Sequence, residues 1–221
     1  MSAAAPRRRF DFDTLAPVER YKLLIGSVVP RPIAWITTVD TEGRVNAAPY
    51  SFFNVLSHDP ALLAIGVENH ADMRMKDTAA NIRATQEFTV NIVDFATVEA
   101  MNVTALPFPP EVDELAEAGL TAAPGVRVGS PYIAEAPVAF ECRNHTTLNI
   151  GRSREIVLGE VLTMHVREDL LNERLHIDPA RLDAVGRMGG QGYATIRDRF
   201  ELPSMTLARW QELRPAEPAA E

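Results

Sequence analysis

The feature that most constrains the fold is a series of short segments rich in β-branched and aromatic residues, each bounded by turn-forming residues. Such runs favour β-strands. The expected strands are 33–39, 45–53, 61–67, 88–93, 137–143 and 155–166. A turn at residues 41–43 predicts that the first two strands pair as a hairpin. The last strand carries apolar residues on both faces, which indicates a barrel strand that is covered on each side.

Helices are expected to be fewer. Helical spacing or a capping signal is found at 77–85, 95–103, 111–118 and 178–185. Between residues 105 and 136 the chain is rich in proline, and so long an irregular excursion is usually functional or lid-like. Many strands with scattered helices favour a β-barrel over a doubly wound sheet.

The composition excludes several classes of protein. The 221 residues carry a net charge of −8 and one cysteine, Cys142, which excludes an intramolecular disulfide and a zinc site of several thiolates. The acidic balance argues against nucleic-acid binding. We find neither a long apolar span nor a secretory signal and expect a cytoplasmic protein without a membrane segment. A single domain over residues 10–205 is expected, with flexible tails at 1–9 and 214–221.

A helix that begins near Lys76 is a candidate seat for one phosphate group. Asp77 or Thr78 is suited to cap this helix, whose first turn has free backbone N–H groups and a positive dipole. Lys76 adds a full positive charge, and an anion is bound well at such a helix start. The chain has no glycine-rich phosphate loop. The simpler alternative is an ordinary capped helix with a surface lysine.

A second candidate segment reads Asn-Ala-Ala-Pro-Tyr-Ser-Phe-Phe-Asn, from residue 46 to residue 54. Its small residues would let a flat ligand approach the backbone. Pro49 removes a ladder donor, so the strand is interrupted there or lies at an edge. Ser51 and Asn54 offer hydrogen bonds. The alternative is a bulged barrel strand whose aromatic side chains fill the core.

Two further segments could contact a ligand. Arg31 lies between two prolines, which favour extended backbone, so its side chain is held ready for a phosphate, a carbonyl or a structural ion pair. The segment 187–193 reads Arg-Met-Gly-Gly-Gln-Gly-Tyr. Its glycines allow close approach of backbone, and Tyr193 can stack or donate a hydrogen bond. As an alternative, this segment is a plain loop closure.

Other reactive side chains point to no site of their own. The five histidines lack the spacing of metal ligands, so we predict no metal site. Cys142 lies in an apolar strand and is expected to be a buried filler. No nucleophile elbow is present, which argues against a serine hydrolase. His145 or His165 could face a substrate, but a core or surface role is the favoured interpretation.

In their order along the chain, four blocks resemble the flavin reductase-like family, the FMN-binding split-barrel flavoproteins that include flavoredoxin. The blocks are 31–38, 46–54, 76–82 and 187–193. The resemblance implies a mainly β fold, a six-stranded antiparallel Greek-key split β-barrel with peripheral α-helices. It also implies a homodimer with an FMN near the subunit interface.

By motif position, the resemblance assigns a set of residues to FMN binding. They are Arg31, Ala47, Ala48, Pro49, Ser51, Phe52, Asn54, Lys76, Thr78, Asn81, Gly189 and Tyr193. Lys76 and Thr78 would hold the phosphate, and residues 47–54 would lie along the flavin. No catalytic side chain is assigned, because the cofactor carries the hydride chemistry.

The function implied is that of an oxidoreductase of the flavin reductase type, which passes hydride from NADH or NADPH to FMN. The electrons would then pass to an oxygenase or another redox protein, or leave with reduced flavin. An alternative is a non-enzymatic FMN electron carrier, similar to flavoredoxin, that serves a protein partner. A third reading is a barrel that no longer binds flavin. Because the chain has one cysteine and therefore no dithiol, its redox chemistry has to come from a cofactor.

Overall fold

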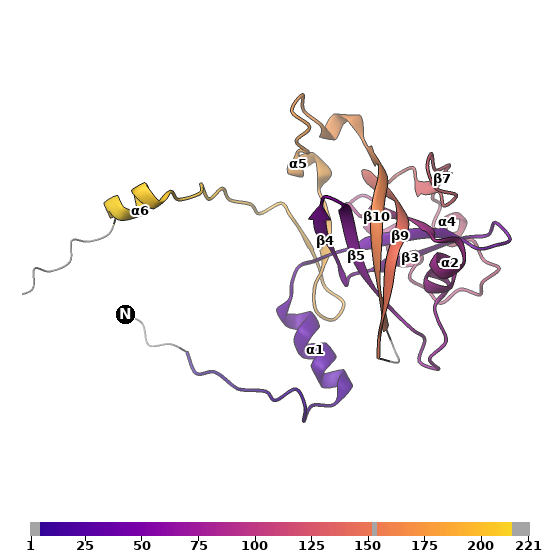
Figure 1. The fold of residues 1–221 in the computed structure, drawn as a ribbon, viewed down its shortest axis with the longest axis horizontal. Coiled ribbons are helices and arrows are strands. Elements are labelled where there is room, and N and C mark those ends of the chain that lie inside the picture. The colour runs from indigo at the N-terminus through magenta and orange to yellow at the C-terminus, as the bar shows by residue number, and fades with distance from the viewer. Residues whose placement is uncertain (1–4, 152–153, 214–221) are drawn as a thin grey trace, which may run out of the picture.

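A computed structural model describes residues 5–151 and 154–213, and its main element is an antiparallel sheet of seven strands in the order β3-β2-β6-β9-β10-β5-β4 (Figure 1). The strands are β2 (Ala34–Val39), β3 (Val45–Tyr50), β4 (Phe53–His58), β5 (Ala61–Glu68), β6 (Glu87–Ile92), β9 (Val138–Ile150) and β10 (Arg154–Val166). The predicted hairpin is confirmed, since β2 and β3 pair from Val39 and Val45 onward.

The sheet curls into an incompletely closed barrel. Strands β3 and β4 lie at its opposite edges, yet only Ser51 and Phe52 separate them in the chain. So short a link spans at most about 11 Å, so the two edges must approach each other. Two irregularities in the pairing of β10 with β9 add curvature. The predicted mainly β split barrel is confirmed, with seven strands instead of six, because the expected strand 45–53 ends at Tyr50 and a strand that was not predicted, β4, follows the link.

Strand β2 separates two buried clusters of apolar side chains. Ile36 and Phe88 belong to the first cluster, and Trp35 and Met101 belong to the second. Both faces of β2 are therefore covered, as expected for a barrel strand. Close packing also explains Gly159, where an added Cβ would lie 2.3 Å from the Phe88 ring. Cys142 is a buried filler as predicted, and burial raises the pKa of its thiol.

Short sheets and helices surround the barrel. They are β1 (Arg31–Pro32), β11 (Val185–Arg187), β12 (Tyr193–Thr195), β7 (Ala122–Ala123), β8 (Tyr132–Ile133), α1 (Pro17–Ser27), α2 (Asp77–Thr85), α3 (Val98–Val103), α4 (Glu114–Glu117), η1 (Glu168–Leu170), α5 (Pro179–Leu182) and α6 (Leu207–Leu213). Helix α2 has its predicted bounds, while α3, α4 and α5 are shorter than predicted. Helix α4 begins late because the Asp113 carboxylate caps it, accepting from the N–H groups of Leu115 and Ala116.

Helices α1 and α6 were not predicted, and none of their residues is buried. Apolar residues do recur at helical spacing in both segments, at 18, 21, 24 and 25 in α1 and at 207, 210 and 213 in α6. Among the described residues, no helix has the length and apolar character needed to cross a membrane. Of the predicted tails, residues 1–4 and 214–221 lie outside the described residues.

The excursion over residues 105–136 is fastened to the barrel by buried side chains. The Glu141 carboxylate accepts from the backbone N–H groups of residues 126, 127 and 128. Asn91 Oδ1 accepts from the N–H of Ile133, and Thr37 Oγ1 donates to the carbonyl of Pro131. These contacts hold the second half of the excursion as a fixed wall rather than a free lid.

Candidate functional site

Three adjoining cavities form a groove along β3 and the link to β4. Their volumes are about 350, 220 and 310 Å³. The first two share Pro49, Tyr50 and Ala105, and the last two share Ser51. The groove therefore follows the region where the barrel does not close.

The first cavity contains the start of helix α2. Lys76 occupies the cap position and makes no side-chain capping bond, so the prediction that Asp77 or Thr78 caps the helix is wrong. Thr78 is the second residue of the helix, and its buried hydroxyl donates to Asn46 Oδ1 at 3.0 Å. The first N–H groups of α2 therefore have no side-chain acceptor from the cap, and Lys76 forms no ion pair within residues 5–151 and 154–213. Free backbone N–H groups and a positive side chain both favour the binding of an anion here.

Glu114, from the excursion, also lines this cavity and was missed by the sequence analysis. Its carboxylate accepts from Asn46 Nδ2 at 2.8 Å and from the Ala47 N–H at 3.1 Å. Burial raises the pKa of Glu114, and these hydrogen bonds offset only part of that effect. The Ala47 N–H is thus used inside the protein. No sequence pattern connects a residue at 114 with a strand at 46, because the contact depends on how the excursion folds back.

Tyr50 lines both the first and the second cavity. Its hydroxyl is buried and lies next to the Thr78 hydroxyl, but makes no hydrogen bond of good geometry in the described part of the chain. Burial raises the pKa of Tyr50 to about 12, so the phenol keeps its proton at neutral pH. A buried hydroxyl of this kind is commonly satisfied by water or a ligand. This observation fits a polar ligand in the groove.

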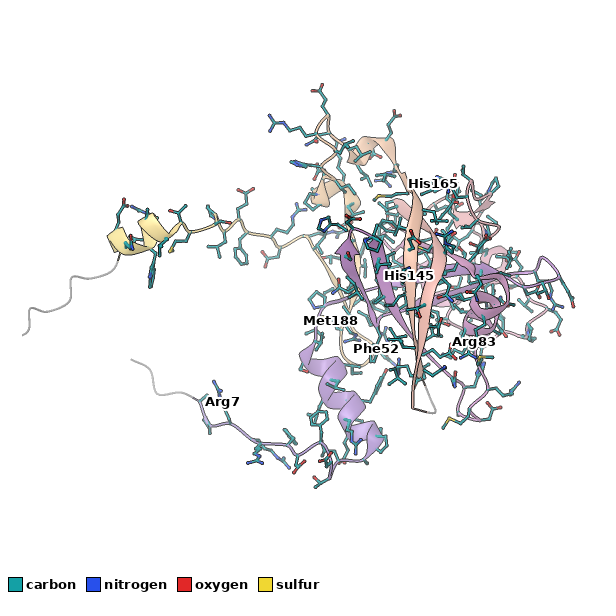
Figure 2. All side chains as sticks on the ribbon, in the orientation of Figure 1. Arg7, Phe52, Arg83, His145, His165 and Met188 are labelled. Atoms are coloured by element: carbon teal, nitrogen blue, oxygen red, sulfur yellow. The ribbon has the colours of Figure 1, made fainter. Side chains whose placement is uncertain are left out.

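The third cavity is bounded by the β3–β4 link and by α1. The Phe52 ring lies between the Tyr21 ring, with centroids 6.5 Å apart, and the Arg154 guanidinium, 4.5 Å from its centroid. Figure 2 shows Phe52 below the barrel, beside the end of α1. Ser51 Oγ accepts from Arg31, while exposed Asn54 bonds the neighbouring backbone N–H of Val55. Tyr21 and Arg154 were not predicted, because each meets Phe52 only through the tertiary fold.

Arg31 is a buried anchor. Nη1 donates to the carbonyls of Ile25 at 2.6 Å and Val28 at 3.0 Å, and Nη2 donates to the carbonyl of Met188 at 3.1 Å. These bonds tie the end of α1 and the glycine segment to the barrel. Arg31 lines the third cavity and Lys76 the first, so the structure does not bring these two predicted phosphate ligands together.

The remaining predicted residues divide into two groups. Ala48, Pro49 and Tyr193 line the groove, and Arg187 stacks on the Tyr193 ring at 4.5 Å. Three others line none of the three cavities: Ala47 is buried under Glu114, Asn81 donates to Thr38 Oγ1 at 3.0 Å, and Gly189 packs against Gly26 of α1. Their assignment to FMN stays a prediction that rests on motif position.

The two histidines singled out in the sequence lie outside the groove. His165 is at the opposite end of the barrel from Phe52 (Figure 2). Its Nε2 lies 2.5 Å from Glu141 Oε1 and its ring stacks on Tyr132 with centroids 4.3 Å apart. His145 is exposed on β9. Within the described ranges, no group of three His, Cys, Asp or Glu residues is arranged to hold a metal ion.

Known proteins share this fold and sequence over most of the chain. An uncharacterized protein of Deinococcus radiodurans is 47% identical over 210 residues, which cover 92% of each chain. The crystal structure of nitrilotriacetate monooxygenase component B from Bacillus cereus superposes with a TM-score of 0.86 at 33% identity, covering 90% of this chain and all of that one. The crystal structure of the 2-nitrobenzoate 2-nitroreductase NbaA of Pseudomonas fluorescens superposes with a TM-score of 0.82 at 34% identity, covering 95% of this chain and all of that one.

A family model described as the flavin reductase like domain matches residues 25–185. This range contains the barrel, helix α2 and nearly all of the groove. The predicted resemblance is therefore confirmed, and a flavin-related redox function comes with it. The chain belongs to the flavin reductase-like family.

Proposed function

We propose that this protein is an oxidoreductase that binds FMN in the groove and accepts hydride from NADH or NADPH. The observation that carries the proposal is the first cavity, where the start of α2 and Lys76, which forms no ion pair among the described residues, lie beside Ala48 and Pro49 of β3. One phosphate seat next to a strand with little side-chain bulk suits a flavin mononucleotide. When bound, FMN would supply the hydride and electron chemistry.

The side chains around the groove would bind and orient this group. Lys76 and the first N–H groups of α2 would hold the phosphate. Ala48 and Pro49 leave space for close approach to β3, and the Tyr50 phenol keeps a donor available beside it. At the other end, Phe52 is held in place by its two stacked neighbours.

Two relatives suggest where the electrons would go. One is named as a component of a monooxygenase, the other as a nitroreductase. We propose that reduced flavin from this protein serves either an oxygenase component or a small electron-poor acceptor such as a nitroaromatic compound. A homodimer and residence in the cytoplasm are part of the same proposal.

The visible spectrum of the purified protein, followed by rapid mixing with each nicotinamide, tests the proposal. We expect a yellow protein whose flavin absorbance bleaches within seconds with NADH or NADPH. Slow bleaching with both, together with rapid exchange with a redox protein, would instead identify an electron carrier. A colourless protein with no affinity for FMN, riboflavin or FAD in fluorescence titrations would contradict flavin binding altogether.

A further inference from the structure

The C-terminal arm, residues 198–213, leaves the barrel and extends far from it (yellow in Figure 1). Every residue from 197 to 213 is exposed. The large apolar residues of the arm are Phe200 (88% exposed), Leu202 (84%), Met205 (60%), Leu207 (71%), Trp210 (50%) and Leu213 (53%). So many exposed apolar side chains in one segment mark an interaction site rather than an ordinary surface.

The apolar residues of the arm follow the period of its backbone. Phe200 and Leu202 are two residues apart in an extended segment, so they point to the same side. Leu207, Trp210 and Leu213 are three residues apart on α6 and share one helical face. The charged residues Glu201, Arg209 and Glu212 lie at positions between them. This is the pattern of a segment that lies along a surface with one side covered.

A surface that suits the arm lies around helix α1 and edge strand β4. We call it the α1–β4 face. Its exposed apolar residues are Tyr21, Leu24, Val28, Val55 and Leu56. The third cavity opens within it, lined largely by apolar side chains. Strand β4 is an edge of the sheet, and an exposed apolar edge strand is normally covered in a stable protein.

We infer that the arm of one copy docks on the α1–β4 face of a second copy, and that the second copy reciprocates. Within the described ranges, the hydrogen bonds of α6 are all local, such as the Trp210 N–H to the Thr206 carbonyl, so nothing holds the arm to its own barrel. Two exchanged arms with six large apolar side chains each would remove roughly 1,000 Å² of apolar surface from water. That area is sufficient for a specific dimer.

The exchange would also complete the candidate site. The third cavity is lined by Arg31, Ser51, Phe52 and Asn54, so a docked arm would cover this end of the groove. The part of the inference that concerns flavin rests on the proposed function, whereas the exchange of arms does not.

Engineered cysteines test the exchange directly. One chain carries Trp210→Cys, and separate chains carry Leu24→Cys, Val28→Cys or Val55→Cys; the native Cys142 is fully buried and does not compete. After mixing and mild oxidation, we expect a disulfide between unlike chains for at least one receiving position. A chain with Val126→Cys, exposed on the excursion, is the matched control and should not cross-link.

Two outcomes would overturn the inference. If Leu24→Cys and Trp210→Cys in the same chain form a disulfide within single chains at low protein concentration, the arm covers its own barrel. If no receiving position cross-links above the control, the arm does not dock on the α1–β4 face.

A second measurement uses the full-length chain with Leu202→Glu and Trp210→Glu. We expect the dimer dissociation constant, from sedimentation, to rise at least 100-fold, with the thermal unfolding of the barrel retained. Val126→Glu with Leu175→Glu, two exposed apolar residues elsewhere, is the control. A dimer that is unaffected, or a wild-type chain that is monomeric, would refute the exchange. If wild-type protein does not bind FMN but still cross-links, the proposed function fails while the exchange stands.

Discussion

The two ends of the groove are built in contrasting ways. At the α2 end, Glu114, Asn46 and Thr78 form a continuous chain of hydrogen bonds, and the polar groups are fixed before any ligand arrives. At the α1 end, most of the lining side chains are apolar, and Leu24 and Val28 among them are exposed to water. A rigid polar end can recognise a charged group by itself, whereas an exposed apolar end needs a further surface to cover it.

The largest effect is expected at the polar end. Lys76→Ala should weaken FMN binding about 100-fold, because a hydrogen bond to a charged group contributes about 1.5–3 kcal/mol. Riboflavin, which lacks the phosphate, should bind as before. Fluorescence titration of both flavins measures this, with Lys22→Ala on α1 as the matched control. An equal loss for the two flavins would remove Lys76 from the phosphate seat.

Glu114→Ala should reduce the free energy of unfolding by about 2 kcal/mol, because the Ala47 N–H and the Asn46 amide lose their acceptor. Urea denaturation measures the effect, and Glu117→Ala, exposed on the same helix, should change little. A loss no larger than that of the control would show that the polar end is not held by this carboxylate.

At the apolar end, Arg154→Gln should lower stability by about 1 kcal/mol and FMN affinity a few-fold, because it removes the cation above Phe52. Arg197 offers a matched control, since it stacks on Phe95 at 4.2 Å and also pairs with an acidic residue. Arg197→Gln should cost similar stability and leave FMN binding unchanged. If both variants bind FMN equally, the Arg154 cation above Phe52 does not contribute to FMN binding.

The smallest effect concerns pH. Because burial raises the pKa of Glu114 above 4.5 in the folded state, the native protein binds more protons than the unfolded chain just above that pH. The contribution of Glu114 to stability is therefore complete below pH 4.5 and is lost as the pH rises through the folded-state pKa. Glu114→Gln should remove this slope from unfolding curves measured between pH 4 and about 7. If the pH dependence of stability is unchanged in this variant, Glu114 does not take up the extra proton of the folded state.

Glu141 at the far end of the barrel should behave in the opposite way. Burial raises the pKa of this carboxyl, but bonds from His165 and three backbone N–H groups lower it more, so its net pKa lies below 4.5. Stability from Glu141 is present above pH 4.5 and is lost as the pH falls through the folded-state pKa. The contributions of Glu114 and Glu141 to stability therefore change with pH in opposite directions.

Much of the fold could be predicted from local sequence. The strand segments were identified from their β-branched and aromatic residues, and helix α2 was identified from its alanine-rich run after a capping signal. The strand break at Ser51–Phe52 could not be placed, since it depends on β4 pairing with β5 across the barrel. Helix α1 was missed although Val18, Tyr21 and Leu24 recur at helical spacing after a proline at the helix start.

The candidate site could be predicted in part. Lys76, Thr78 and residues 48–54 lie on the groove, as short motifs on one strand and one helix start suggested. Glu114 reaches the groove and Tyr21 reaches Phe52 from distant parts of the chain, and no local pattern encodes such contacts. Arg31 shows the same limit, because its three carbonyl acceptors include one 157 residues away.

The link of Ser51 and Phe52 also has a mechanical consequence. It joins the two free edges of the barrel, and the groove lies along the opening between them. A ligand seated there would act as a cross-brace that resists the spreading of β3 from β4. Tight binding would thus stiffen both strands together. Amide hydrogen exchange in β3 and β4, the first and last strands of the sheet, should slow by similar factors as the ligand concentration is raised.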